Sequence, residues 1–195
     1  MMSKFTLSLV FLFISLTVSA QSIISPKEFL GYEIGTKFSR HHQVVDFFKE
    51  IASTTPTQVK LEQYGSTYEG RPLYHAFVSS EENIKNLEAI RENNLKRTGI
   101  LDGQANNDNI AIVWLSYNVH GNETSSSEAA MKTLYELVQP DNQRAKTWLE
   151  NTVVIIDPMI NPDGRDRYVY WYKQMVGEGP NANYISREHH EPWPG

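Results

Sequence analysis

Two segments, residues 110–117 and 152–156, are almost entirely apolar and rich in β-branched side chains. Continuous runs of this length predict strands that are buried on both faces, as in a parallel sheet. Between them lies an amphipathic pattern that opens on Ser125 and Glu128, spaced as a capping box, and stops at Pro140. Strand, helix and strand at this spacing predict a parallel crossover unit, with residues 110–117 as a central strand. The chain is therefore predicted to be an α/β protein.

The upstream segments add flanking elements to this unit. Apolar residues at helical spacing predict a helix over about residues 39–53, with Ser39 as its cap. Two extended runs, which begin at Val59 and Leu73 and are separated by a glycine-bounded turn, predict a hairpin. Ser79 and Glu82 predict the start of another helix, which ends near residue 99, and a short helix is expected near 141–149. Together these give a mixed, largely parallel central sheet with flanking helices.

The first 20 residues stand apart from the rest. A positive start at Lys4, an apolar run and the small residues before Gln21 indicate a signal peptide cleaved near Ala20 and Gln21. A membrane anchor is the alternative, but the apolar run falls short of the ~20 residues that a spanning helix needs, and no later segment is longer. We therefore expect a secreted or periplasmic protein with no transmembrane segment in its mature chain. Residues 21–37 form a lead-in and residues 38–195 a single domain.

Composition narrows the chemistry. The sequence has no cysteine, which excludes disulfides, thiolate metal ligands and a cysteine nucleophile. Removal of Lys4 with the signal peptide changes the net charge from −5 to −6. With no basic cluster left to follow a phosphate backbone, the composition argues against nucleic-acid binding.

The strongest candidate site follows the two predicted strands. In an open parallel sheet, ligands bind beyond the carboxyl ends of the strands. One strand is followed by His120 and Glu123, and the other by an Asn-Pro-Asp-Gly segment at residues 161–164. An imidazole and a carboxylate three positions apart, with Gly121 allowing a turn between them, can converge on one zinc ion. The alternative is a polar loop that caps the next helix.

Three motifs in this order resemble the zinc carboxypeptidase family of the carboxypeptidase A/B type. They are the HxxE pair His120 and Glu123, the Asn-Pro-Asp-Gly turn, and an upstream hairpin whose second strand starts at Gly-Arg-Pro, residues 70–72. The resemblance covers about residues 38–195. It implies a carboxypeptidase-like fold, one zinc ion held by His120 and Glu123, and a peptide substrate cleaved at its carboxyl end. The third ligand, the general base and the carboxylate-binding Asn-Arg pair are expected beyond residue 195, so the chain is expected to be C-terminally truncated and inactive alone.

The resemblance also implies an arginine that stabilises the oxyanion, and Arg167 is the candidate among Arg165, Arg167 and Arg187. Other polar and aromatic residues receive structural interpretations. His189, His190 and Glu191 are interpreted as a polar loop, the aromatic cluster at residues 168–172 as packing, His41 and His42 as solvent-facing, and His75 as packed in a strand. Two alternatives stay open: hydrolysis of peptidoglycan stem peptides or acyl-amino acids on the same fold, and a non-catalytic binding or vestigial module.

Overall fold

The computed structural model describes residues 23–193. The expected signal peptide and its cleavage point lie outside these residues. A four-stranded sheet in the order β1-β2-β4-β3 forms the centre of the fold. Its strands are β1 (Val59–Ser66), β2 (Pro72–Val78), β3 (Ala111–Ser116) and β4 (Thr152–Asp157). The helices are α1 (Pro26–Leu30), α2 (His41–Thr54), α3 (Glu81–Lys85), α4 (Leu87–Arg97), α5 (Ser125–Val138), α6 (Gln143–Glu150) and α7 (Pro162–Met175), followed by a 3₁₀ turn, η1 (Arg187–His189).

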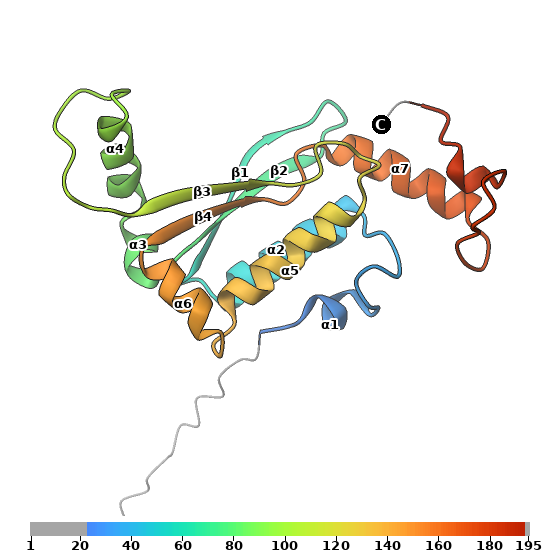
Figure 1. Ribbon diagram of the computed structural model, residues 1–195, viewed down its shortest axis with the longest axis horizontal. Coiled ribbons are helices and arrows are strands. Elements are labelled where there is room, and N and C mark those ends of the chain that lie inside the picture. Colours follow the sequence, from blue (N-terminus) through green and yellow to red (C-terminus); the bar gives the residue numbers. More distant parts are fainter. Residues whose placement is uncertain (1–22, 194–195) are drawn as a thin grey trace, which may run out of the picture.

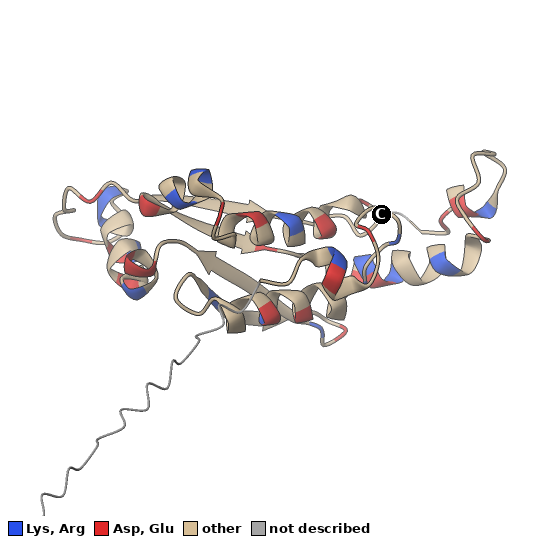
Figure 2. Ribbon diagram, turned by 90° about the horizontal axis from the view of Figure 1, so that it is seen from below, with Lys and Arg blue, Asp and Glu red and all other residues tan. Residues whose placement is uncertain are grey.

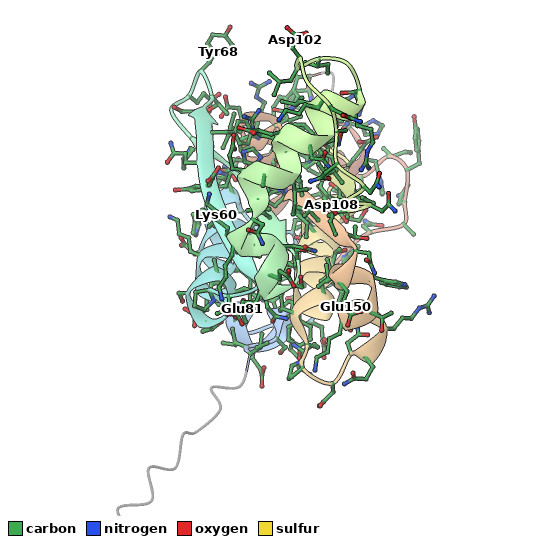
Figure 3. The ribbon with its side chains drawn as sticks, turned by 90° about the vertical axis from the view of Figure 1, so that its left-hand side faces the viewer. Lys60, Tyr68, Glu81, Asp102, Asp108 and Glu150 are labelled. Atoms are coloured by element: carbon green, nitrogen blue, oxygen red, sulfur yellow. The ribbon has the colours of Figure 1, made fainter. Side chains whose placement is uncertain are left out.

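The predicted crossover unit is confirmed. Strands β3 and β4 pair in parallel, with Ala111 opposite Thr152 and Ser116 opposite Asp157, and α5 connects them. Strands β1 and β2 form the predicted antiparallel hairpin, at whose tip Tyr68 points into solvent (Figure 3). Because β2 also pairs with β4 in the antiparallel sense, the sheet is mixed as expected, and one of the three pairings among the described strands is parallel.

The hydrophobic core lies between one face of the sheet and helices α2 and α5, which run side by side beneath it (Figure 1). Helix α2 contributes Phe47, Phe48 and Ile51, and α5 contributes Met131 and Leu134, all fully buried. Strands β1, β2 and β4 complete the core from above with Val59, Ala76, Val78, Val154 and Ile156. These side chains stand on one face because the side-chain period of a strand is two.

The opposite face of the sheet is largely open within residues 23–193, and here one expectation is wrong. Strand β3 lies at the sheet edge rather than in the centre. Its apolar residues on this face remain accessible, with Ile112 36% and Trp114 62% exposed. Helix α4 covers only one end of this face (Figure 1), where a groove of about 250 Å³ lies between Leu87, Ile90 and the strands. Strand β3 therefore has the apolar side chains expected of a strand that is buried on both faces, but it pairs with only one strand and its open face is accessible.

Several helix boundaries also differ from the predicted ones. Helix α2 begins after Arg40, whose N–H donates to the Gln43 side chain, so Ser39 is not its cap. The capping residue of α3 is Ser80 rather than Ser79, because the Ser79 hydroxyl is buried and donates to the carbonyls of Leu149 and Thr152. The predicted single helix is divided at Asn86 into α3 and α4.

The helix surfaces carry acidic and basic residues close together (Figure 2). Several of them form ion pairs one turn apart, such as Lys85 with Glu81 at 2.6 Å and Lys132 with Glu136 at 2.6 Å. Each such pair stabilises its helix by only about 0.3–0.5 kcal/mol. In the described part of the chain, no helix is long and apolar enough to cross a membrane.

Candidate metal centre

The loop that carries His120 and Glu123 leaves β3 through a sharp reversal at Asn118. This residue has a positive φ of 56°, a conformation in which asparagine is enriched. Its side-chain Nδ2 donates to the His120 carbonyl at 2.7 Å, and its own carbonyl accepts from the Asn161 N–H at 3.2 Å. Asn118 is 2% exposed and shapes the loop from inside. Sequence reasoning missed it, although an asparagine directly after a strand is a recognisable signal for such a reversal.

The two predicted ligands, His120 and Glu123, lie next to each other in the loop that follows the carboxyl end of β3. The Nδ1 atom of His120 is 3.1 Å from Oε2 of Glu123, and both side chains are more than half exposed. Zinc bonds of about 2.0–2.1 Å at a tetrahedral angle place two ligand atoms about 3.3 Å apart. One imidazole nitrogen and one carboxylate oxygen at the observed separation therefore fit a single zinc ion as neighbouring ligands.

The loop rests on the first turn of α7, and Gly121 makes the closest approach. A Cβ atom at Gly121 would stand 2.1 Å from the carbonyl carbon of Gly164, which no side chain could tolerate. The Asn-Pro-Asp-Gly segment is not only a turn. It is the start of a helix, with Asn161 as cap and Pro162 at the first helical position. This helix was not predicted from the sequence, in which residues 161–164 were interpreted as a turn.

A buried ion pair fixes α5 against α7 behind the loop. Arg165 is fully buried, and its Nη2 atom lies 2.7 and 2.9 Å from the two carboxylate oxygens of Glu128. The guanidinium also donates to the carbonyls of Ser39 and Thr124. Glu128 therefore does not act in a capping box, and Thr124 is the residue that precedes α5. The predicted Ser125 and Glu128 box is wrong because the carboxylate turns inward to a partner on another helix.

The Gly-Arg-Pro segment meets the same helix start. Arg71 donates to Asp163 at 2.7 Å and to Asp166 at 3.0 Å, and the Thr67 hydroxyl donates to Asp163 at 2.8 Å. Asp163 therefore links the start of α7 to the hairpin. The three motifs recognised in the sequence converge on the first turn of α7.

A family model described as zinc carboxypeptidase matches residues 44–190. The chain belongs to the zinc carboxypeptidase family. Among solved structures it is similar to the carboxypeptidase A from Helicoverpa armigera, with a TM-score of 0.54 and 17% identity over 86% of this chain and 34% of that one. It is also similar to thrombin activatable fibrinolysis inhibitor, with a TM-score of 0.50 and 17% identity over 67% of this chain and 27% of that one. The chain thus spans about a third or less of these structures, and at these identities the likeness concerns the fold.

The three arginines near the site of this zinc carboxypeptidase family member have different surroundings. Arg165 is used inside the protein, and Arg187 is exposed on η1. Arg167 is 51% exposed at its side chain, lies 3.9 Å from Glu69 and faces the ring of Trp193. It also lines a polar cavity of about 260 Å³ together with Gly121, Asn122, Asn161, Asp163, Gly164, Tyr168 and Trp193. Arg165 and Arg167 both lie near the metal loop, but of the three only Arg167 is an exposed arginine that lines this cavity.

The remaining histidines do not extend the zinc site among the described residues. His189 and His190 contact the carbonyls of Asn181 and Tyr184, and Glu191 accepts from Asn122. Between residues 23 and 193, no three His, Cys, Asp or Glu side chains gather closely enough to hold an ion.

His41 was expected in solvent, but it is 6% exposed, with Nε2 2.9 Å from the Pro72 carbonyl.

A second polar cluster, missed in the sequence, lies at the end of β4. The Tyr64 hydroxyl donates to Asp157 at 2.6 Å, and the Asp157 carboxylate also accepts from the Met159 N–H. Burial raises the pKa of Asp157 above its usual value and lowers the pKa of nearby His75. His75 packs among aromatic rings as expected, but its buried Nδ1 has no hydrogen-bond partner in the described structure.

Proposed function

We propose that this chain is part of an exported zinc metallocarboxypeptidase in which His120 and Glu123 hold one zinc ion. The observation that carries the proposal is the 3.1 Å separation of the His120 and Glu123 ligand atoms at the mouth of β3. Zinc in such a site polarises the scissile carbonyl and lowers the pKa of a bound water to about 7. The zinc carboxypeptidase family and fold support this chemistry.

The substrate in this proposal is the carboxyl-terminal end of a peptide. Arg167 is positioned to contribute a positive charge beside the metal loop, where oxyanion charge would develop on a bound carbonyl. Replacement Arg167→Ala is expected to lower kcat by about 10²–10³-fold if the guanidinium has this role. Arg187→Ala is the control, because Arg187 is an exposed arginine of the same region. Equal effects of the two changes would remove Arg167 from the proposed site.

Two protein ligands are fewer than the three that catalytic zinc sites use. We therefore expect the 195-residue chain alone to bind zinc weakly and to release little product. Export follows in this proposal from the signal peptide at residues 1–20, and N-terminal sequencing of the secreted protein should begin at Gln21. A mature protein that retains residues 1–20 would contradict export by cleavage.

The central test is chelator-sensitive release of carboxyl-terminal residues from peptides by the full-length protein. His120→Ala should abolish this release and the binding of stoichiometric zinc. His42→Ala removes an exposed imidazole of α2 and should change neither, which makes it the matched control. Full activity in His120→Ala would refute the metal assignment.

A further inference from the structure

We infer that Asn161 is a positioning residue for the metal loop, acting through the Val119 carbonyl on the backbone immediately before His120. This inference rests on the proposed zinc site. It assigns to the Asn-Pro-Asp-Gly segment a function beyond shaping its own turn, namely setting the position of the two ligands.

The side chain of Asn161 makes two different hydrogen bonds. Its Oδ1 accepts from the Gly164 N–H at 2.9 Å and so caps α7. Its Nδ2 donates to the Val119 carbonyl at 3.1 Å, across 42 residues of sequence. Capping needs only the oxygen, because an N-cap acts as an acceptor. The amide nitrogen is therefore free to bind the metal loop, and aspartate or serine would lose that second bond while keeping the first.

Contacts from the first turn of α7 bracket both ligands. Asn161 holds Val119 on one side of His120, and Arg165 holds the Thr124 carbonyl directly after Glu123. Between the ligands, Gly121 packs on Gly164. The start of α7 thus contacts the loop before, between and after His120 and Glu123.

This bracketing matters because both ligand side chains are more than half exposed, at 59% and 63%. Their positions depend on the backbone that carries them. Groups that orient metal ligands from outside the coordination shell typically change metal affinity by about 10–100-fold when they are removed. The Asn161 amide acts on the ligand backbone in the same way, so its loss should lower zinc affinity within this range.

The chain offers a matched control for this test. Asn142 caps α6 through Oδ1, which accepts from the Ala145 N–H at 3.1 Å, while its Nδ2 donates to the Glu136 carbonyl at 2.9 Å. It lies beyond the far end of α5, a helix about 20 Å long, and so far from the metal loop. Asn142→Asp and Asn142→Ser thus remove the same kind of bond at a helix start that does not touch the proposed site.

The experiment compares four variants of the full-length protein: Asn161→Asp, Asn161→Ser, Asn142→Asp and Asn142→Ser. Zinc affinity is measured by competition with a chromogenic chelator, and the Tm of each zinc-free form is measured separately. Both Asn161 variants should lose about 10–100-fold in zinc affinity, whereas the Asn142 variants keep wild-type affinity. The visible spectrum of the Co²⁺-loaded protein should shift only in the Asn161 variants. The serine variants show that the effect does not come from an added charge.

Unchanged zinc affinity and an unchanged Co²⁺ spectrum in Asn161→Ser would overturn the inference. Failure of both Asn161 variants to fold, while both Asn142 variants fold, would also overturn it, because Asn161 would then have a purely structural role. Failure of the proposed function looks different: His120→Ala would then bind zinc as tightly as the wild type.

Discussion

Gly121 is the residue of the proposed site with the least room for change. Its backbone touches that of Gly164 so closely that even a methyl group would stand 2.1 Å from a carbonyl carbon. The neighbouring atom belongs to the backbone of a helix start and cannot rotate away. Only glycine therefore fits at position 121. The reason is the lack of space for a Cβ atom and not the backbone conformation, because Gly121 does not have a positive φ.

Gly121→Ala should lower the free energy of unfolding by about 1–3 kcal/mol or more, as overpacking of a close contact does. It should also weaken zinc binding, because the loop must move away from α7. Urea unfolding of the zinc-free protein checks the first effect and chelator competition the second. Gly177→Ala is the control, since a Cβ at Gly177 would meet no atom within 4 Å. Similar small effects from both changes would show that the loop can shift without cost.

Single residues of the site were predictable to different degrees. His120 and Glu123 were expected to be near each other because their spacing and their place after a strand are local features. Glu128 was misassigned because its partner, Arg165, lies 37 positions away and the local pattern matched a capping box. Local sequence patterns carry no information on which distant side chain a carboxylate meets, so the buried ion pair could not be predicted.

At the level of elements, strands were predicted more accurately than helix ends. The four strands lie where their apolar runs predicted them, because a buried strand produces a local pattern of consecutive or alternating apolar residues. Helix α7 was missed because its aromatic residues and Gly164 have low helix propensity. Asn161 and Pro162 nevertheless form a capping residue followed by a proline at the first helical position. That start signal outweighed the propensity of the residues after it.

The contact between α2 and β2 predicts a pH dependence of stability. His41 is buried at the start of α2 and contacts the Pro72 carbonyl. Its pKa is lowered by burial, with Arg71 and His42 acting in the same direction and the Pro72 carbonyl and Asp166 opposing. The unfolded state therefore binds a proton at a higher pH than the folded state. The stability that neutral His41 contributes is present above about pH 6.5 and is lost as the pH falls from there toward the folded pKa.

His41→Gln can keep the hydrogen bond to the Pro72 carbonyl but does not titrate. Its free energy of unfolding should therefore fall less than that of the wild type between about pH 7.5 and pH 5.5, as measured by urea unfolding. His42→Gln is the matched control at the adjacent exposed position and should follow the wild type. A wild-type slope in His41→Gln would assign the pH dependence to other groups, of which His75 is one with a lowered pKa.

At the level of the whole molecule, helices α2 and α5 cover one face of the sheet, and the other face is largely open within residues 23–193 (Figure 1). Residues 110–117 were predicted to lie in the centre of the sheet because their side chains are apolar on both faces. This composition shows that both faces of the strand favour burial. It does not show which strands or helices lie next to it. In the described structure β3 is an edge strand, and Trp114 and Ile112 stand on the open face beside Ile155 and Phe77.

An exposed apolar edge strand is a template for intermolecular pairing. The 195-residue chain on its own should therefore self-associate as its concentration rises, as measured by light scattering. Trp114→Lys places a charge on this edge and should reduce the association, with little loss of stability because Trp114 is already 62% exposed. Trp148→Lys introduces the same charge at a tryptophan that is 51% exposed on α6 rather than on a strand, and should leave the association unchanged. Equal effects of the two substitutions would assign the association to net charge rather than to β3, because only Trp114 lies on a strand with an unpaired side.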